Sequence, residues 1–213
     1  MNYYISDLHL FCKNQTKSGT VNHDNRPFEN IGVMHATILE KWNKKITNGD
    51  TVYILGDISM RGKCDELIAL VAQLKGKKVL IKGNHDDLTD LRYKQLFAEI
   101  CDYKELQDNF EGRAYKLVLS HYPILMWNGQ HKGVMLLYGH THNSIEDTYY
   151  KECLRKMNES IELRHEGDSK IRAYNVGCMH SYMDYEPRTL KEILVANEED
   201  MGVLHYHKTK KEV

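Results

Sequence analysis

The chain has 213 residues, of which 41% are hydrophobic and 28% charged, and its formal net charge is −1. This composition supplies enough apolar material for one folded domain over residues 1–213 and excludes wholesale disorder. The nearly neutral charge argues against a stable complex with nucleic acid, because that affinity comes from many basic contacts to phosphates.

Six short apolar segments have the length and the β-branched and aromatic content of buried strands. In chain order they are residues 3–6, 51–55, 78–81, 115–120, 134–138 and 171–175. Helical patterns lie between several of them: an apolar stripe runs through residues 29–47, and a second one precedes Gly76. The segment from Thr189 to Glu192 has the form of a capping box that opens a late helix. Strands that alternate with helices predict an α/β fold with a largely parallel or mixed sheet.

Residues 144–170 are dense in charge and show little apolar periodicity. We interpret this stretch as a charged, partly helical insertion on the surface of the domain. A lid over a site, a contact between two copies and a plain solvated insertion all fit this pattern, and we expect the plain insertion.

Aspartate, asparagine or histidine follows directly after each of the first five predicted strands. These groups are Ser6-Asp7-Leu8-His9, Gly56-Asp57, Gly83-Asn84-His85-Asp86, Ser120-His121 and Gly139-His140-Thr141-His142. The carboxyl ends of strands are where open α/β sheets place their sites. Each group alone is explained by a turn or a helix cap. Turn formation does not explain why four of the five groups supply an imidazole.

These side chains form a donor set that suits divalent metal ions. Residues two apart on an extended chain point the same way, so Asp7 and His9 can address one ion together. A set of carboxylate, imidazole and amide oxygen without cysteine argues against a structural zinc site, and we expect manganese, with iron(II), zinc or nickel as alternatives. The seven donors exceed what one tetrahedral ion binds, so we predict two ions that share a carboxylate. The predicted ligands are Asp7, His9, Asp57, Asn84, His121, His140 and His142.

Two adjacent divalent ions are a common device for displacement at phosphorus, because they bind phosphoryl oxygens and lower the pKa of a water between them. The leaving oxygen then needs a proton. We predict that His85 is the general acid and that the neighbouring Asp86 orients its imidazole. Arg26, in the loop after the first group, can hold a substrate phosphate through two parallel hydrogen bonds; an ordinary surface arginine is the alternative.

The five groups, in this order and without substitution at a ligand position, resemble the signature of the calcineurin-like metallophosphoesterases, and they cover residues 7–142. The segment from Asn175 to Gly177 is similar to the strand that follows the last group in bacterial and phage members. The resemblance implies a four-layer α/β/β/α sandwich with two mixed β-sheets. It also implies that His85 is the residue nearest the leaving group. The metal ligands that it implies are Asp7, His9 and His142 for one ion, Asn84, His121 and His140 for the other, and Asp57 as the bridge.

We therefore expect an enzyme that hydrolyses a small or nucleotide phosphate ester, either a monoester or a diester, by attack of a hydroxide held between the ions. The alternative is a catalytically silent metal-binding scaffold of the same fold, which should have lost ligands or the general acid, and here none is lost. No apolar run is long enough to cross a bilayer, no signal-peptide pattern opens the chain, and the five cysteines are isolated and odd in number. These features predict a cytoplasmic protein without a membrane partner, and no oligomeric state follows from them.

Overall fold

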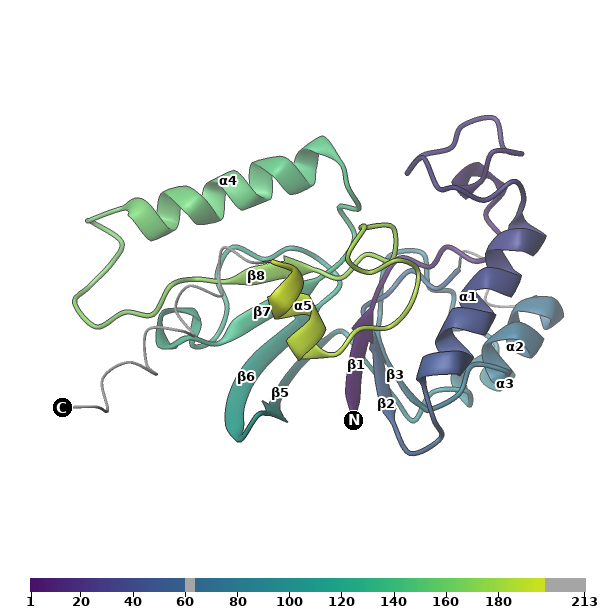
Figure 1. Cartoon of the computed structure of the whole chain (residues 1–213), viewed down its shortest axis with the longest axis horizontal. Helices are drawn as coiled ribbons and strands as arrows, with labels where there is room; N and C mark the ends of the chain where they lie inside the picture. The colour runs from purple at the N-terminus through teal and green to yellow at the C-terminus, as the bar shows by residue number, and fades with distance from the viewer. Residues whose placement is uncertain (60–63, 198–213) are drawn as a thin grey trace.

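The computed structural model describes residues 1–59 and 64–197, which form two four-stranded β-sheets with helices packed on them (Figure 1). The first sheet contains β1 (Asn2–Ile5), β2 (Thr51–Ile54), β3 (Lys77–Ile81) and β4 (Glu99–Cys101) in that order, and all its pairs are parallel. The second sheet contains β5 (Tyr103–Phe110), β6 (Arg113–Ser120), β7 (Met135–Tyr138) and β8 (Ala173–Asn175). Here β5 is antiparallel to β6, whereas β6, β7 and β8 are parallel. The predicted α/β fold with two β-sheets is confirmed; the four named strands of the first sheet are parallel, and an isolated bridge between Tyr4 and Arg188 is antiparallel.

The helices are α1 (Ile31–Lys45), α2 (Asp65–Ala72), α3 (Leu91–Lys94), α4 (Ile145–Glu159) and α5 (Leu190–Ala196), with short 3-10 turns η1 (Lys13–Gln15) and η2 (Gln130–Lys132). In Figure 1, α1, α2 and α3 flank the first sheet, and α4 runs along the second. The predicted capping box is confirmed, because the Thr189 side chain accepts from the Glu192 backbone N–H while the Glu192 side chain accepts from the Thr189 backbone N–H. Within the described ranges, no helix is long and apolar enough to span a bilayer.

Buried side chains form two clusters, because the second sheet is apolar on both of its faces. Successive residues of a strand point to opposite faces. Thus Leu117 and Leu137 join the larger cluster, which also holds Trp42 of α1, whereas the adjacent Val118 and Leu136 join a smaller cluster. The smaller cluster lies on the other face of the sheet, where α4 shields it from solvent.

For the helical part of residues 144–170, the structure corrects the expectation of a plain solvated stretch. The Ser144 side chain accepts from the Glu146 backbone N–H and caps α4. Asp147, Tyr150 and Leu154 are buried along one side of this helix, at the spacing of three and four expected for a packed face. The side chains of Tyr150 and Leu154 belong to the smaller cluster, so α4 is part of the packed structure.

Candidate metal centre

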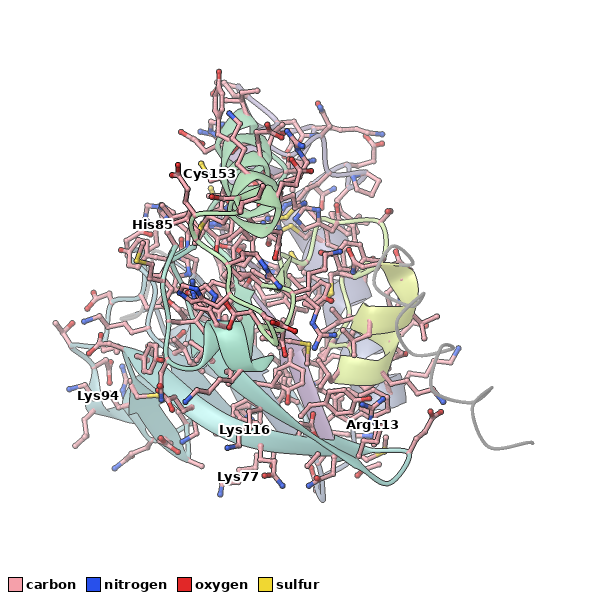
Figure 2. The ribbon with its side chains drawn as sticks, turned by 90° about the vertical axis from the view of Figure 1, so that its left-hand side faces the viewer. Lys77, His85, Lys94, Arg113, Lys116 and Cys153 are labelled. Carbon is pink, nitrogen blue, oxygen red and sulfur yellow. The ribbon has the colours of Figure 1, made fainter. Side chains whose placement is uncertain are left out.

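The predicted site residues meet where β1, β2, β3, β6 and β7 end. In Figure 2, Lys77, which begins β3, lies at the bottom of the view, and His85, which follows that strand, lies in the upper half. The donor atoms of Asp7, His9 and His142 lie within 4.8 Å of one another, and so do those of Asp57, His121 and His140. The structure therefore brings six of the seven predicted ligands into two clusters.

Asp57 belongs to the second cluster and also faces the first. Its Oδ2 is 3.7 Å from His9 Nε2 of the first cluster, and its Oδ1 is 3.6 Å from His121 Nε2 of the second. The Asp57 side chain is only 2% exposed, which leaves its two oxygens facing the clusters rather than solvent. This geometry suits the bridging position that the resemblance implies.

The backbone at the strand ends is left-handed at five of the predicted ligands. The φ angles are 57° at Asp7, 47° at His9, 54° at Asp57, 70° at His140 and 51° at His142. Such angles are uncommon for residues other than glycine and cost of order 1–3 kcal/mol each. Asp7 and His9 converge as predicted, but the predicted reason, an extended chain, is wrong. The side chains converge because the backbone turns sharply after each strand.

Asp7 is fully buried and held by hydrogen bonds from two sides. Ser6 Oγ donates to Asp7 Oδ2 over 2.6 Å, and the His140 backbone N–H approaches Oδ1 and Oδ2 at 3.2 and 3.1 Å. Burial alone would raise the pKa of Asp7, but His142, whose Nε2 lies 3.6 Å from Asp7 Oδ1, lowers it well below the ordinary range. Asp7 is therefore an anion at neutral pH, as a metal ligand must be.

His121 presents one nitrogen to the protein and the other to the centre. Its Nδ1 lies 2.8 Å from the Leu55 carbonyl oxygen, which can only accept, so Nδ1 carries the proton. Its Nε2 then faces Asn84 Oδ1 at 3.0 Å, and His140 Nδ1 lies 2.9 Å from the same oxygen. Electron-rich atoms at such short range are stabilised by a cation among them, so the donors of this cluster fit a divalent ion.

His9 and His142 are also close, with 3.0 Å between their Nε2 atoms. Burial lowers the pKa of His9 to about 3, so this ring is neutral and able to bind a metal. Burial also disfavours the charged form of His142, but the hydrogen bond to Asp24 and the nearby charges of Asp7 and Asp24 outweigh it and raise the pKa of His142 to about 9 without a metal. The first cluster thus attracts positive charge, which fits a cation site.

His85 lies beside this cluster, half-buried. Its backbone N–H donates to Asp57 Oδ1 over 2.9 Å, and its ring meets the ring of His9 edge to face with 5.5 Å between centroids. A substrate phosphate bound at the two clusters would therefore have an imidazole next to it.

Asp86 does not have the predicted role of orienting His85. Its carboxylate instead accepts backbone N–H bonds from Gly83 and Asp57, both over 2.9 Å, and from Ile58 over 3.0 Å. These bonds join the turn after β3 to the turn after β2. Asp86 therefore positions two loops of the centre, because its oxygens are committed to the backbone.

Arg26 is corrected as a substrate-binding residue. Its side chain is 0% exposed and donates to the carbonyl oxygens of Asp7 and Leu8 over 2.8 and 2.9 Å, and to the carboxylate of Asp24. A guanidinium that is buried and engaged in this way cannot reach a substrate.

Two glycines of the motifs are required for space rather than for turn formation. A methyl group at Gly83 would lie 2.2 Å from Asp57 Oδ1. One at Gly139 would lie 2.5 Å from Ser6 Oγ and 2.6 Å from Asp7 Oδ2. Neither contact is tolerated, so only glycine lets these turns approach the carboxylates.

The turn after β7 is held by residues that were not predicted from the sequence. Asp147 Oδ1 of α4 accepts from Tyr138 Oη, Thr141 Oγ1 and Asn175 Nδ2 over 2.9, 3.0 and 2.9 Å. Asn175 Nδ2 also donates to the His142 carbonyl oxygen over 2.9 Å. The charged helix and β8 therefore support the two histidines of this turn, and the likeness of residues 175–177 to a family strand was the one signal in the sequence.

Comparison with known proteins agrees with this geometry. The family model described as calcineurin-like phosphoesterase matches residues 3–204. An uncharacterized protein of Methanocaldococcus jannaschii is 30% identical over 164 residues, which are 76% of this chain and 81% of that protein. The gene 66 protein of Mycobacterium phage D29 is 32% identical over 130 residues, 51% of this chain and 65% of that protein.

A solved structure shares the fold. The crystal structure of a protein of unknown function from Aquifex aeolicus superposes with a TM-score of 0.61 and covers 92% of this chain and 98% of its own. The two sequences are 24% identical, so this likeness concerns the fold alone.

Proposed function

Because this chain belongs to the calcineurin-like phosphoesterase family, we propose that it is an enzyme that hydrolyses phosphate esters with two divalent metal ions. The observation that carries the proposal is the pair of donor clusters with Asp57 between them. Seven donors around two adjacent positions match the needs of a two-metal phosphoesterase, in which the ions lie about 3.5–4 Å apart.

In this proposal each ion has its own set of protein ligands, and we expect manganese, with iron(II), zinc or nickel as alternatives. Two ions in such a centre supply positive charge to the phosphoryl oxygens and make water acidic enough to attack at neutral pH. The protein keeps these donors in place through the left-handed turns and the hydrogen bonds described above. Asp7, His9 and His142 would hold the first ion, Asn84, His121 and His140 would hold the second, and Asp57 would serve both.

His85 would give a proton to the leaving oxygen. Its backbone is anchored on Asp57, its ring adjoins His9, and the side chain is half-buried rather than enclosed. A group that donates a proton in the transition state typically contributes a factor of about 10²–10⁴.

The substrate we propose is a small phosphate ester or a nucleotide. Tyr122 is 45% exposed, and its ring lies 4.7 Å, centroid to centroid, from that of His140. An exposed aromatic ring at the edge of the centre provides a surface on which a base or an aryl group can stack. We also propose a cytoplasmic location, in keeping with five free cysteines.

The test is hydrolysis of bis(p-nitrophenyl) phosphate and p-nitrophenyl phosphate by metal-stripped protein before and after manganese is added. We expect turnover only with the metal, a loss of about 10²–10⁴-fold in His85→Ala with manganese still bound, and no loss in the control His165→Ala, which alters an exposed histidine. Asp57→Asn should lose both activity and metal. Wild-type protein that binds two ions but leaves both esters intact would favour the silent scaffold instead.

A further inference from the structure

Asp24 reaches the candidate centre from the loop between η1 and α1. It lies 118 residues before His142 in the sequence, yet its Oδ1 is 2.7 Å from His142 Nδ1. The Asp24 residue is only 7% exposed, so this contact is shielded from water. We propose that Asp24, held by Arg26, is a positioning residue that sets the ring of His142 for metal binding.

Arg26 fixes the carboxylate in place. Its Nε and Nη2 both donate to Asp24 Oδ2, over 3.0 and 2.9 Å, which leaves Oδ1 for His142. The same guanidinium donates to the carbonyl oxygens of Asp7 and Leu8. The pair therefore links the ring of one candidate ligand to the backbone of another, and every oxygen of the carboxylate has a defined partner.

The contact determines which nitrogen of His142 is free. A carboxylate can only accept, so the proton of the neutral ring resides on Nδ1. Its Nε2 then presents a lone pair toward Asp7 Oδ1, 3.6 Å away, and toward His9 Nε2. A carboxylate that orients a metal-binding imidazole in this manner strengthens metal affinity by about 10–100-fold.

The substitution Asp24→Asn should reverse this arrangement. The amide oxygen of an asparagine would turn to Arg26, and its NH₂ group would then donate to His142 Nδ1. The ring proton would move to Nε2, where it blocks the metal. The change is nearly isosteric, so the loss comes from hydrogen-bond chemistry rather than from shape.

The rival explanation is that Asp24 is only a structural ion-pair partner of Arg26. Asn22 offers a matched control, because its side chain accepts from the Arg26 backbone N–H over 3.0 Å and donates to the Arg26 carbonyl oxygen over 2.9 Å. Asn22→Ala loosens the same loop without touching His142. A structural role predicts similar losses in both variants, and a positioning role predicts a loss of metal affinity in Asp24→Asn alone.

The experiment is a calorimetric titration of Mn²⁺ into the metal-stripped full chain, with no ester present. We expect Asp24→Asn to weaken one of the two ions by about 10–100-fold, while the other ion, whose His121 is oriented by Leu55, stays within about twofold in its dissociation constant. Asn22→Ala should bind both ions as the wild type does. Equal binding by Asp24→Asn and wild type, or an equal loss in Asn22→Ala, would overturn the proposal.

Nitrogen NMR of the wild-type chain with the imidazoles labelled gives a second measurement that does not depend on how the variant folds. Above pH 9, where the ring of His142 is neutral, a proton on Nδ1 supports the proposal, and a proton on Nε2 overturns it. The inference rests on the proposed function only for the metal. A chain that binds Mn²⁺ in this way and hydrolyses no ester would refute the enzyme and leave the role of Asp24 intact.

Discussion

The substitution Asp86→Ala should lower the free energy of unfolding, because it removes the acceptor shared by two turns of the centre. Three backbone N–H groups, of Gly83, Asp57 and Ile58, lose a carboxylate partner at 2.9–3.0 Å. At about 1 kcal/mol for each bond, the expected loss is about 3 kcal/mol. For a chain of this size that corresponds to a fall of roughly 6–12 °C in the thermal midpoint.

The loss is measured by urea unfolding of metal-stripped protein, followed by circular dichroism. The control is Asp87→Ala, which removes the next carboxylate along the chain and its local bonds to Thr89. That change should cost less than about 1 kcal/mol, because these bonds are exposed. If Asp86→Ala unfolds like the wild type but alters the pH profile of hydrolysis, Asp86 acts on His85 after all, and our explanation of it is wrong.

Three further predictions follow from the centre and its support. Gly139→Ala should abolish high-affinity Mn²⁺ binding in a titration, because the new methyl group collides with Asp7 Oδ2, and a normal isotherm would refute the crowding. Burial alone would raise the pKa of Asp147, but hydrogen bonds from Lys151 and Asn175 outweigh burial, so the pKa in the folded protein lies below its ordinary value. The stabilisation from Asp147 is therefore complete above the unfolded carboxyl pKa and lost as pH falls through the folded pKa, so urea titrations from pH 6 to 3 should show a flatter acid limb in Asp147→Asn. Adding Mn²⁺ at 100 times its dissociation constant should stabilise the wild type by about 2.7 kcal/mol per site, and an unchanged thermal midpoint would contradict metal binding.

The strands that carry the centre were predictable because each is a short run of buried apolar residues. β4 and β5 were not, for a physical reason. β4 has only three residues, and β5 alternates between exposed and half-buried positions along Tyr103–Phe110, so it lacks the continuous apolar run of a buried strand. β5 is a strand because it hydrogen-bonds to β6, and this pairing cannot be recognised from the amino-acid composition of β5.

The candidate ligands were predictable because imidazole and carboxylate recur after strand after strand. Their supports were harder to find. Asp24 and Asp147 belong to charged stretches in which any carboxylate looks solvated, and only the fold shows that they are buried. Asp86 was predicted to orient His85 because the two are adjacent in the sequence. Its oxygens instead accept from backbone N–H groups that include two lying 28 and 29 residues away. Arg26 was taken for an anion-binding group because its burial is likewise invisible in the sequence.

The position of β1 bears on when the centre can form during synthesis. This strand pairs with β2 on one side, and on the other side its residues Tyr4 and Ser6 form bridges to Arg188 and Gly177. The turn that carries His142 is likewise held by Asn175. A nascent chain that has emerged only as far as His142 therefore has all seven donors outside the ribosome, but neither the bridges nor this support. The support of the centre is therefore completed only after residues 175–188 have also emerged and joined the fold.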